Sequence, residues 1–118
     1  MPANTTRYEH LAMPLQTYSA RALYGSTFCK RPIEVQILVE DGVVSDIGGS
    51  VECPYSKQWL GALISMAKGL DVESAWGISG DDLRGSISPP EHKEDCVDCD
   101  VYAVAAFRLA LRNWEKKV

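Results

Sequence analysis

The chain has 118 residues, of which 46% are hydrophobic and 24% are charged, and its net charge is −4. This length and composition indicate one domain, over residues 1–118, with its own hydrophobic core. The acidic balance and the scattered basic residues argue against a nucleic-acid binder, because neutralising phosphates needs clustered lysine and arginine.

No apolar run approaches the ~20 residues that cross a bilayer, and the N-terminus lacks a basic segment followed by an apolar one. We therefore expect a cytoplasmic protein with no membrane partner. In that reducing compartment, the four cysteines are expected to be thiols, ligands or catalysts rather than structural disulfides.

The chain opens with a polar segment and a first strand. Residues 1–14 contain two prolines and are expected to form a loose arm or a short docked segment. Residues 15–24 hold β-branched and aromatic residues in irregular alternation, and this composition predicts a strand.

A β-hairpin is the clearest local signal. Apolar and polar residues alternate from residue 33 to residue 39, and Asp41-Gly42 is typical of a hairpin turn. We expect a three-residue loop, residues 40–42, with Gly42 as a left-handed bulge. That loop places Val43 and Ile47 on the apolar face, whereas a two-residue loop would place Asp46 there. The apolar positions of the first hairpin strand are Ile33, Val35, Ile37 and Val39.

Helical spacing begins after the hairpin. Between Pro54 and Lys68, apolar residues recur at intervals of three and four, which predicts an amphipathic helix with Gly69 as its C-cap. The apolar positions of this helix are Trp59, Leu60, Leu63, Ile64 and Ala67.

Two short helices are predicted next, from their caps. Asp71 can cap a helix that runs through Trp76, and Ser79 can cap a second one with Asp82 three residues later. The Pro-Pro pair at residues 89–90 ends this region.

A long final helix is predicted from a cap at Asp98 or Asp100 to about Lys117. Its expected inner face holds Val101, Val104, Phe107 or Ala105, Leu111 and Trp114. Because strands precede helices along the chain, the order predicts an α+β fold: a small antiparallel three-stranded sheet with helices packed on one face.

The four cysteines fall at the junctions between these elements. Cys29 precedes the hairpin, Cys53 lies between the hairpin and the first helix, and Cys96 and Cys99 lie at the start of the last helix. The second hairpin strand runs antiparallel to the first, so its end near Cys53 returns toward Cys29. We therefore expect these thiols to gather at one edge of the sheet.

The chemistry of these positions favours metal binding. Unpaired N–H groups and the positive end of the dipole at a helix start favour a thiolate, the form of cysteine that binds soft metals. Three convergent cysteines suit Zn²⁺ or an iron–sulfur cluster.

Simpler interpretations stay open for each residue. Cys29, Cys53 and Cys99 can each be a small core side chain, Cys96 can be an exposed thiol, and His92 and its acidic neighbours can be a solvated loop. The Cys-x-x-Cys spacing of Cys96 and Cys99 is weak evidence for a redox motif, because a Pro-Pro loop rather than a βαβ unit precedes it.

Taken together, the stretches 33–42, 53–83 and 99–117 resemble the NifU/IscU-like iron–sulfur cluster assembly scaffold family. The family order is a first cysteine, a hairpin with an acidic-Gly turn, a second cysteine that opens a helix, a Pro-Pro loop, and a third cysteine that opens an alanine-rich helix. This chain matches that order over roughly residues 29–117, with Cys29, Asp41-Gly42, Cys53, Lys68-Gly69, Glu73-Ser74-Ala75, Asp81-Asp82-Leu83, Pro89-Pro90 and Cys99.

Of the departures from the family pattern, three lie next to candidate ligands. Lys30-Arg31 follows Cys29 where the family has Gly-Asp, so the carboxylate that helps to keep the cluster labile is missing. Asp98 stands where the family has a histidine before its third cysteine. The Pro-Pro loop is longer and carries Glu91-His92-Lys93 instead of the chaperone-docking Val-Lys.

The resemblance implies a scaffold or carrier rather than an enzyme. It implies transient binding of a [2Fe–2S] cluster, or of Zn²⁺ in a divergent member, by Cys29, Cys53 and Cys99. Asp98, Cys96 or His92 is then expected as the fourth ligand. The implied partners are a cysteine desulfurase and acceptor apoproteins, with the chain a monomer or a weak homodimer.

Two other functions are compatible with the same residues. One is a repurposed, non-catalytic interaction or zinc-binding module on this fold, which the departures at Lys30-Arg31 and Asp98 favour. The other is a thiol–disulfide protein that uses Cys96 and Cys99 as a dithiol.

Overall fold

The computed structural model describes residues 12–25, 32–51, 54–86 and 99–117. Three strands come first: β1 (Ala20–Tyr24), β2 (Ile33–Glu40) and β3 (Val43–Ser50). Four helices follow: α1 (Pro54–Ala67), α2 (Val72–Trp76), α3 (Gly80–Ser86) and α4 (Cys99–Lys117).

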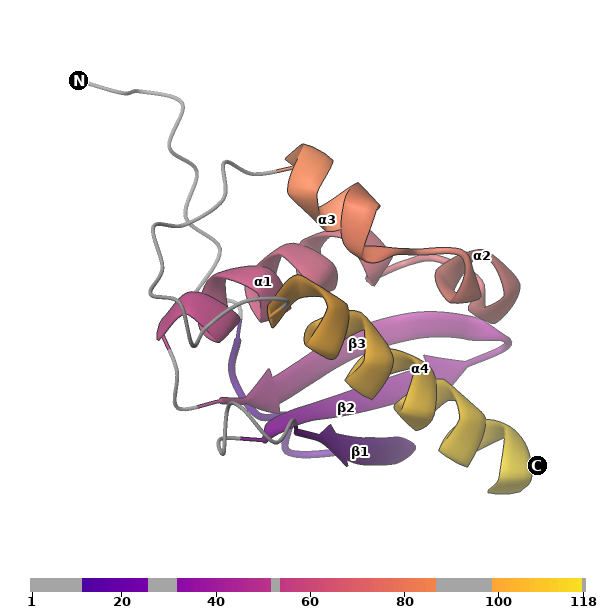
Figure 1. Ribbon diagram of the computed structural model, residues 1–118. Helices are drawn as coiled ribbons and strands as arrows, with labels where there is room; N and C mark the ends of the chain where they lie inside the picture. The colour runs from indigo at the N-terminus through magenta and orange to yellow at the C-terminus, as the bar shows by residue number, and fades with distance from the viewer. Residues whose placement is uncertain (1–11, 26–31, 52–53, 87–98, 118) are drawn as a thin grey trace.

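The strands form one antiparallel sheet in the order β1-β2-β3. One face of this sheet is covered by helices: α4 packs on β1 and β2, α1 packs on β3, and the two helices contact each other (Figure 1). This arrangement confirms the predicted α+β fold. None of the described helices is long and apolar enough to span a membrane.

The core lies between the sheet and these two helices. The alternation in β2 is confirmed for Ile33, Val35 and Ile37, which are at most 2% exposed, whereas Val39 is only half-buried. The five apolar residues predicted for the inner face of α1 are likewise all buried. Burial of this kind contributes roughly 1.5–3 kcal/mol for each large aliphatic side chain, which makes this layer the main source of stability.

The hairpin turn differs from the prediction. Glu40 pairs with Val43, so the loop has two residues, and both have positive φ: 54° at Asp41 and 76° at Gly42. The predicted three-residue loop was wrong. Two left-handed residues form the turn whose twist matches that of the flanking strands, and Asp-Gly accommodates it.

The irregularity that was expected in the loop lies within β3 instead. Leu38 pairs with Asp46 and Val39 pairs with Val44, so Ser45 has no residue opposite it, and its Oγ donates a hydrogen bond to Leu38 O at 3.1 Å. This bulge places Val44, rather than Val43, on the core face together with Ile47. It also keeps Asp46 off that face, as the sequence required.

The first strand is shorter than predicted because residues 12–19 cross the back of the sheet, opposite the helices. Met13 O accepts a hydrogen bond from Gly49 N–H at 2.9 Å, at the outer edge of β3. Leu15 N–H donates to Gln36 Oε1 at 2.6 Å, and the chain joins β2 only at Ser19, whose N–H donates to Ile37 O. Ala12 is buried, so the described part of the predicted arm lies against the sheet.

Gly48 makes this crossing possible. A Cβ at Gly48 would meet Met13 O and would lie 2.7 Å from Leu15 Cγ and 2.9 Å from Leu15 N. The side chain of Gln36, which is 7% exposed, supplies the polar partner for the crossing segment. The absence of a side chain at Gly48 and the buried amide of Gln36 therefore determine where residues 13–15 lie on the sheet.

The link between α1 and α2 covers the other half of the outer edge of β3. Gly69 N–H donates to Val44 O at 2.7 Å, and Val44 N–H donates to Leu70 O at 2.8 Å. Val72 N–H donates to Gly42 O at 2.9 Å. Gly69 has a φ of 93°, as expected for the C-cap of α1.

The caps of the short helices are as predicted. Asp71 Oδ2 accepts from Ser74 N–H at 3.1 Å and begins α2. Ser79 and Asp82 form a capping box before α3: Asp82 Oδ2 accepts from Ser79 N–H at 2.9 Å, and Ser79 Oγ accepts from Asp82 N–H at 3.4 Å.

The inner face of α4 differs in part from the prediction. Val101 is 44% exposed and Ala105 is half-buried, whereas Val104, Phe107 and Leu111 are buried as expected. Ala103, Ala106 and Ala110 complete the buried stripe. These alanines let the helix lie close to the sheet, and their periodicity rotates the buried face away from Val101.

Candidate functional site

The candidate ligands are described only in part. Cys99 is the first residue of α4, and the structure describes its backbone position. The other candidates lie outside the described residues: Cys29, Cys53, His92, Cys96 and Asp98. The described residues that flank these positions show at which end of the sheet the chain leaves toward each of them.

The strand ends that lead toward Cys29 and Cys53 lie together at one end of the sheet. Tyr24, the last residue of β1, pairs with Ile33, the first of β2, and Glu34 pairs with Ser50, the last of β3. We call this end, defined by these four residues, the Tyr24 end. The chain leaves β1 toward Cys29 at the Tyr24 end and leaves β3 toward Cys53 at the same end.

The residues on either side of positions 26–31 lie close together. A Cβ at Gly25 would lie 3.5 Å from Pro32 Cα, so the chain departs from β1 and enters β2 at adjacent points. Val51, just beyond β3, is buried among the core residues. The exit points toward Cys29 and Cys53 are thus fixed by the folded sheet.

An aromatic pair brings the start of α4 to the Tyr24 end. The ring centroids of Tyr24 and Tyr102 lie 5.7 Å apart, with the ring planes inclined by 37°. Tyr102 lies one helical turn after Cys99, so this contact holds the first turn of α4 beside the end of β1. Neither tyrosine was a candidate residue from the sequence alone; the signal available was an aromatic residue one turn after a helix-opening cysteine.

The beginning of α1 lies at the same end. In Figure 1, α1 and α4 both start near the tip of β3 and run back along the sheet. The positive ends of two helix dipoles therefore point toward the region between these termini, where they favour anionic groups such as thiolates.

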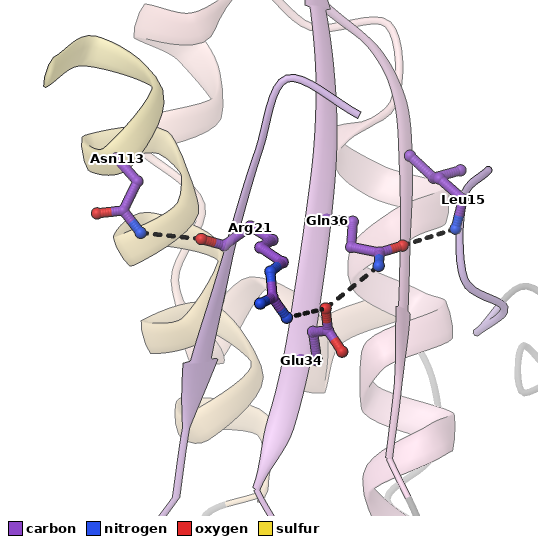
Figure 2. Close-up of polar contacts among 5 residues, drawn as sticks. All are labelled: Leu15, Arg21, Glu34, Gln36 and Asn113. Atoms are coloured by element: carbon purple, nitrogen blue, oxygen red, sulfur yellow. Dashed lines mark hydrogen bonds and ion pairs between the residues drawn. The ribbon is translucent and has the colours of Figure 1, made fainter. Parts of the chain in front are cut away.

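Glu34 is the charged residue among the four that define the Tyr24 end, and its carboxylate is already paired with other side chains. Glu34 Oε2 accepts hydrogen bonds from Arg21 Nη1 at 3.1 Å and from Gln36 Nε2 at 3.2 Å, on the back of the sheet (Figure 2). Within residues 12–25, 32–51, 54–86 and 99–117, no group of three or more histidine, cysteine, aspartate or glutamate side chains could hold a metal ion.

No protein-family model matches the chain, and no curated protein matches it in sequence. Among solved structures, a nitrogen-fixing NifU-like protein (N-terminal) from Brucella abortus is 17% identical with a TM-score of 0.69; the match covers 94% of this chain and 91% of that one.

A second similar structure is an iron–sulfur cluster assembly scaffold protein for the SUF system from Fervidobacterium islandicum AW-1. It is 12% identical with a TM-score of 0.65, and the match covers 88% of this chain and 90% of that one. At such low identity, the likeness concerns the course of the whole chain rather than individual side chains. The chain therefore has the fold of these NifU-like and SufU proteins, which confirms at the level of the fold the resemblance found in its sequence.

Proposed function

We propose that this protein is a scaffold or carrier in iron–sulfur cluster assembly. Its cargo is a nascent [2Fe–2S] cluster, and Cys29, Cys53 and Cys99 supply the thiolate ligands. The observation that carries the proposal is the convergence at the Tyr24 end, where the exits toward Cys29 and Cys53 and the first turn of α4 come together.

The chemistry of the donor set supports this cargo. Thiolates are the ligands that iron–sulfur clusters and Zn²⁺ prefer, and helix starts stabilise their negative charge. The fourth ligand is Asp98, Cys96 or His92, all close to Cys99 in sequence. Zn²⁺ can occupy the same donors when no cluster is held.

The proposed role involves no turnover by the protein itself. A cysteine desulfurase would deliver persulfide sulfur to one thiolate of the scaffold, and iron with an electron donor would complete the cluster. An acceptor apoprotein would then take it. The fold shared with the Fervidobacterium scaffold protein for the SUF system supports this assignment. We infer a monomer or weak homodimer acting in the cytoplasm.

Anaerobic reconstitution with iron and sulfide tests the proposal. The wild-type protein should develop the visible absorbance of a thiolate-bound cluster, and Cys29→Ser, Cys53→Ser and Cys99→Ser should each lose it. If these three variants keep the absorbance of the wild type, the proposal is wrong. Asp98→Ala, Cys96→Ser and His92→Ala identify the fourth ligand, with His10→Ala as the matched control for the histidine.

A repurposed interaction module is the second candidate, favoured by Lys30-Arg31 and Asp98 where the family has Asp and His. Metal analysis of protein purified without added metal separates the two functions. A metal ion whose free concentration is 100 times its Kd stabilises the folded state by about 2.7 kcal/mol. Removing that metal with a chelator should therefore lower Tm. A metal-free protein that binds no Zn²⁺ and is indifferent to the chelator favours the module.

A further inference from the structure

We propose that Tyr24 and Tyr102 form a positioning contact that sets the affinity of the thiolate site, by holding the first turn of α4 against the end of β1. This inference rests on the proposed function, because it concerns the placement of Cys99 as a ligand. Neither tyrosine is itself a ligand in this proposal.

The two rings link a fixed element to a helix end. Tyr24 is in register with Ile33, so the sheet determines its position. Tyr102 lies in the first turn of α4, where a helix has the fewest backbone hydrogen bonds to hold it in place. A centroid distance of 5.7 Å and a tilt of 37° fall within the range of favourable aromatic pairs.

The rest of α4 is held by other contacts. Phe107 and Leu111 are fully buried in the core, and Asn113 Nδ2 donates to Arg21 O at 2.9 Å, near the far end of the helix. Tyr24 and Tyr102 are only half-buried and pack on the margin of that core. Removing one of their rings should therefore affect the placement of the first turn more than the stability of the helix as a whole.

Such a change should appear as a loss of metal affinity. A ligand held in its binding geometry binds more tightly, and removing the groups that orient a metal ligand typically weakens binding by about 10–100-fold. We expect Tyr102→Ala and Tyr24→Ala each to weaken Co²⁺ binding about 10-fold. Tyr102→Phe and Tyr24→Phe keep the ring and should bind like the wild type.

The experiment is an anaerobic titration with Co²⁺ in which the thiolate–Co²⁺ charge-transfer absorbance reports binding by cysteine. Cys99→Ser gives the reference for a lost ligand. Tyr18→Ala is the matched surface control, because Tyr18 is a tyrosine that is 40% exposed and lies before β1. Trp114→Ala is the stability control, because Trp114 packs on the core near the other end of α4.

The positioning role predicts that Trp114→Ala lowers Tm with unchanged Co²⁺ affinity, while Tyr102→Ala lowers the affinity. It also predicts that the double variant Tyr24→Ala/Tyr102→Ala binds no more weakly than either single variant, since both remove one contact. If Tyr102→Ala binds like the wild type while Cys99→Ser binds weakly, the inference is overturned and the proposed function stands.

Two other outcomes are also decisive. If the wild type shows no thiolate–Co²⁺ absorbance, or if Cys99→Ser is unaffected, the proposed function fails and this inference fails with it. If Tyr102→Ala does not fold, Tyr102→Leu keeps apolar bulk at the core margin without the ring. Weaker binding by Tyr102→Leu than by Tyr102→Phe supports the inference, and equal binding overturns it.

Discussion

Asn113 Nδ2 donates a hydrogen bond to the backbone oxygen of Arg21 at 2.9 Å, and this contact ties the last turns of α4 to the start of β1 (Figure 2). Tyr102 ties the start of the same helix to Tyr24 at the end of β1. Two attachments along one strand fix the direction of α4 and its rotation about its own axis. That rotation decides which side chains face the core.

Because of the rotation of α4 about its axis, replacing two nearby valines of this helix by alanine should lower the free energy of unfolding by different amounts. Val104 is 4% exposed and Val101 is 44% exposed. Val104→Ala removes two buried carbons and should lower the free energy of unfolding by about 1.6 kcal/mol. Val101→Ala should stay within about 0.5 kcal/mol of the wild type. Urea unfolding of both variants measures this, and equal losses would contradict the described rotation.

The amide of Gln36 should matter more than the ion pair beside it. Gln36→Leu leaves Leu15 N–H without its acceptor at the back of the sheet, which should lower the free energy of unfolding by about 1–3 kcal/mol. Arg21→Met breaks the 3.1 Å ion pair with Glu34, but the Arg21 side chain is 52% exposed, so the loss should be about 1 kcal/mol or less. Chemical denaturation compares the two, and a larger loss for Arg21→Met would refute this ranking.

Gly48 should tolerate no side chain while residues 13–15 occupy the back of the sheet. Gly48→Ala puts a methyl group against Met13 O and Leu15, and should destabilise the protein by about 1–3 kcal/mol. Gly25→Ala is the control, because the nearest atom to its Cβ would be Pro32 Cα at 3.5 Å, an ordinary contact. Thermal unfolding should separate the two variants clearly, and similar Tm values would count against the described crossing.

The cap of α2 should make stability depend on pH. Hydrogen bonds from the side chain and the backbone N–H of Ser74 lower the pKa of Asp71 below its usual value of 3.8. A lowered folded-state pKa means that the stabilisation is complete above pH 3.8 and is lost as pH falls through the folded-state pKa.

The corresponding measurement is Tm against pH for the wild type and Asp71→Ala. The difference in Tm should be largest near neutral pH and should shrink in acid below pH 3.8. Asp71→Asn keeps a capping oxygen but has no carboxyl group to titrate. The difference in Tm between Asp71→Asn and Asp71→Ala should therefore not shrink in acid. A difference in Tm that is constant from neutral to acid pH would show that the carboxylate charge is not involved.

The sequence predicted the elements that depend on nearby residues. The spacing of Trp59 and Leu63 fixed the buried face of α1, and Asp71 and Ser79 marked the helix starts by local hydrogen bonds. The hairpin was also recognised, but its turn length was not. The bulge at Ser45 corrects the register inside β3; without it, the alternation favoured a three-residue loop, because a two-residue loop would have placed Asp46 on the core face.

Contacts between distant segments could not be predicted in the same way. The crossing of residues 13–15 depends on Gly48 and Gln36, whose roles appear only when β2 and β3 are paired. The pairing of Tyr24 with Tyr102 likewise requires the helix to be laid along β1. For the candidate site, the antiparallel hairpin alone predicted that the exits toward Cys29 and Cys53 share one end of the sheet, and the strand register agrees.

The two stretches that line the outer side of β3 have a consequence for self-association. A bare edge strand is a template on which further chains can add, and stacked strands of this kind grow into fibrils. Here Gly49 N–H is taken by Met13, and both backbone groups of Val44 are taken by residues 69 and 70. Concentrated solutions of the folded protein should thus have little tendency to nucleate fibrils from this strand, and variants that detach residues 12–15 should acquire it.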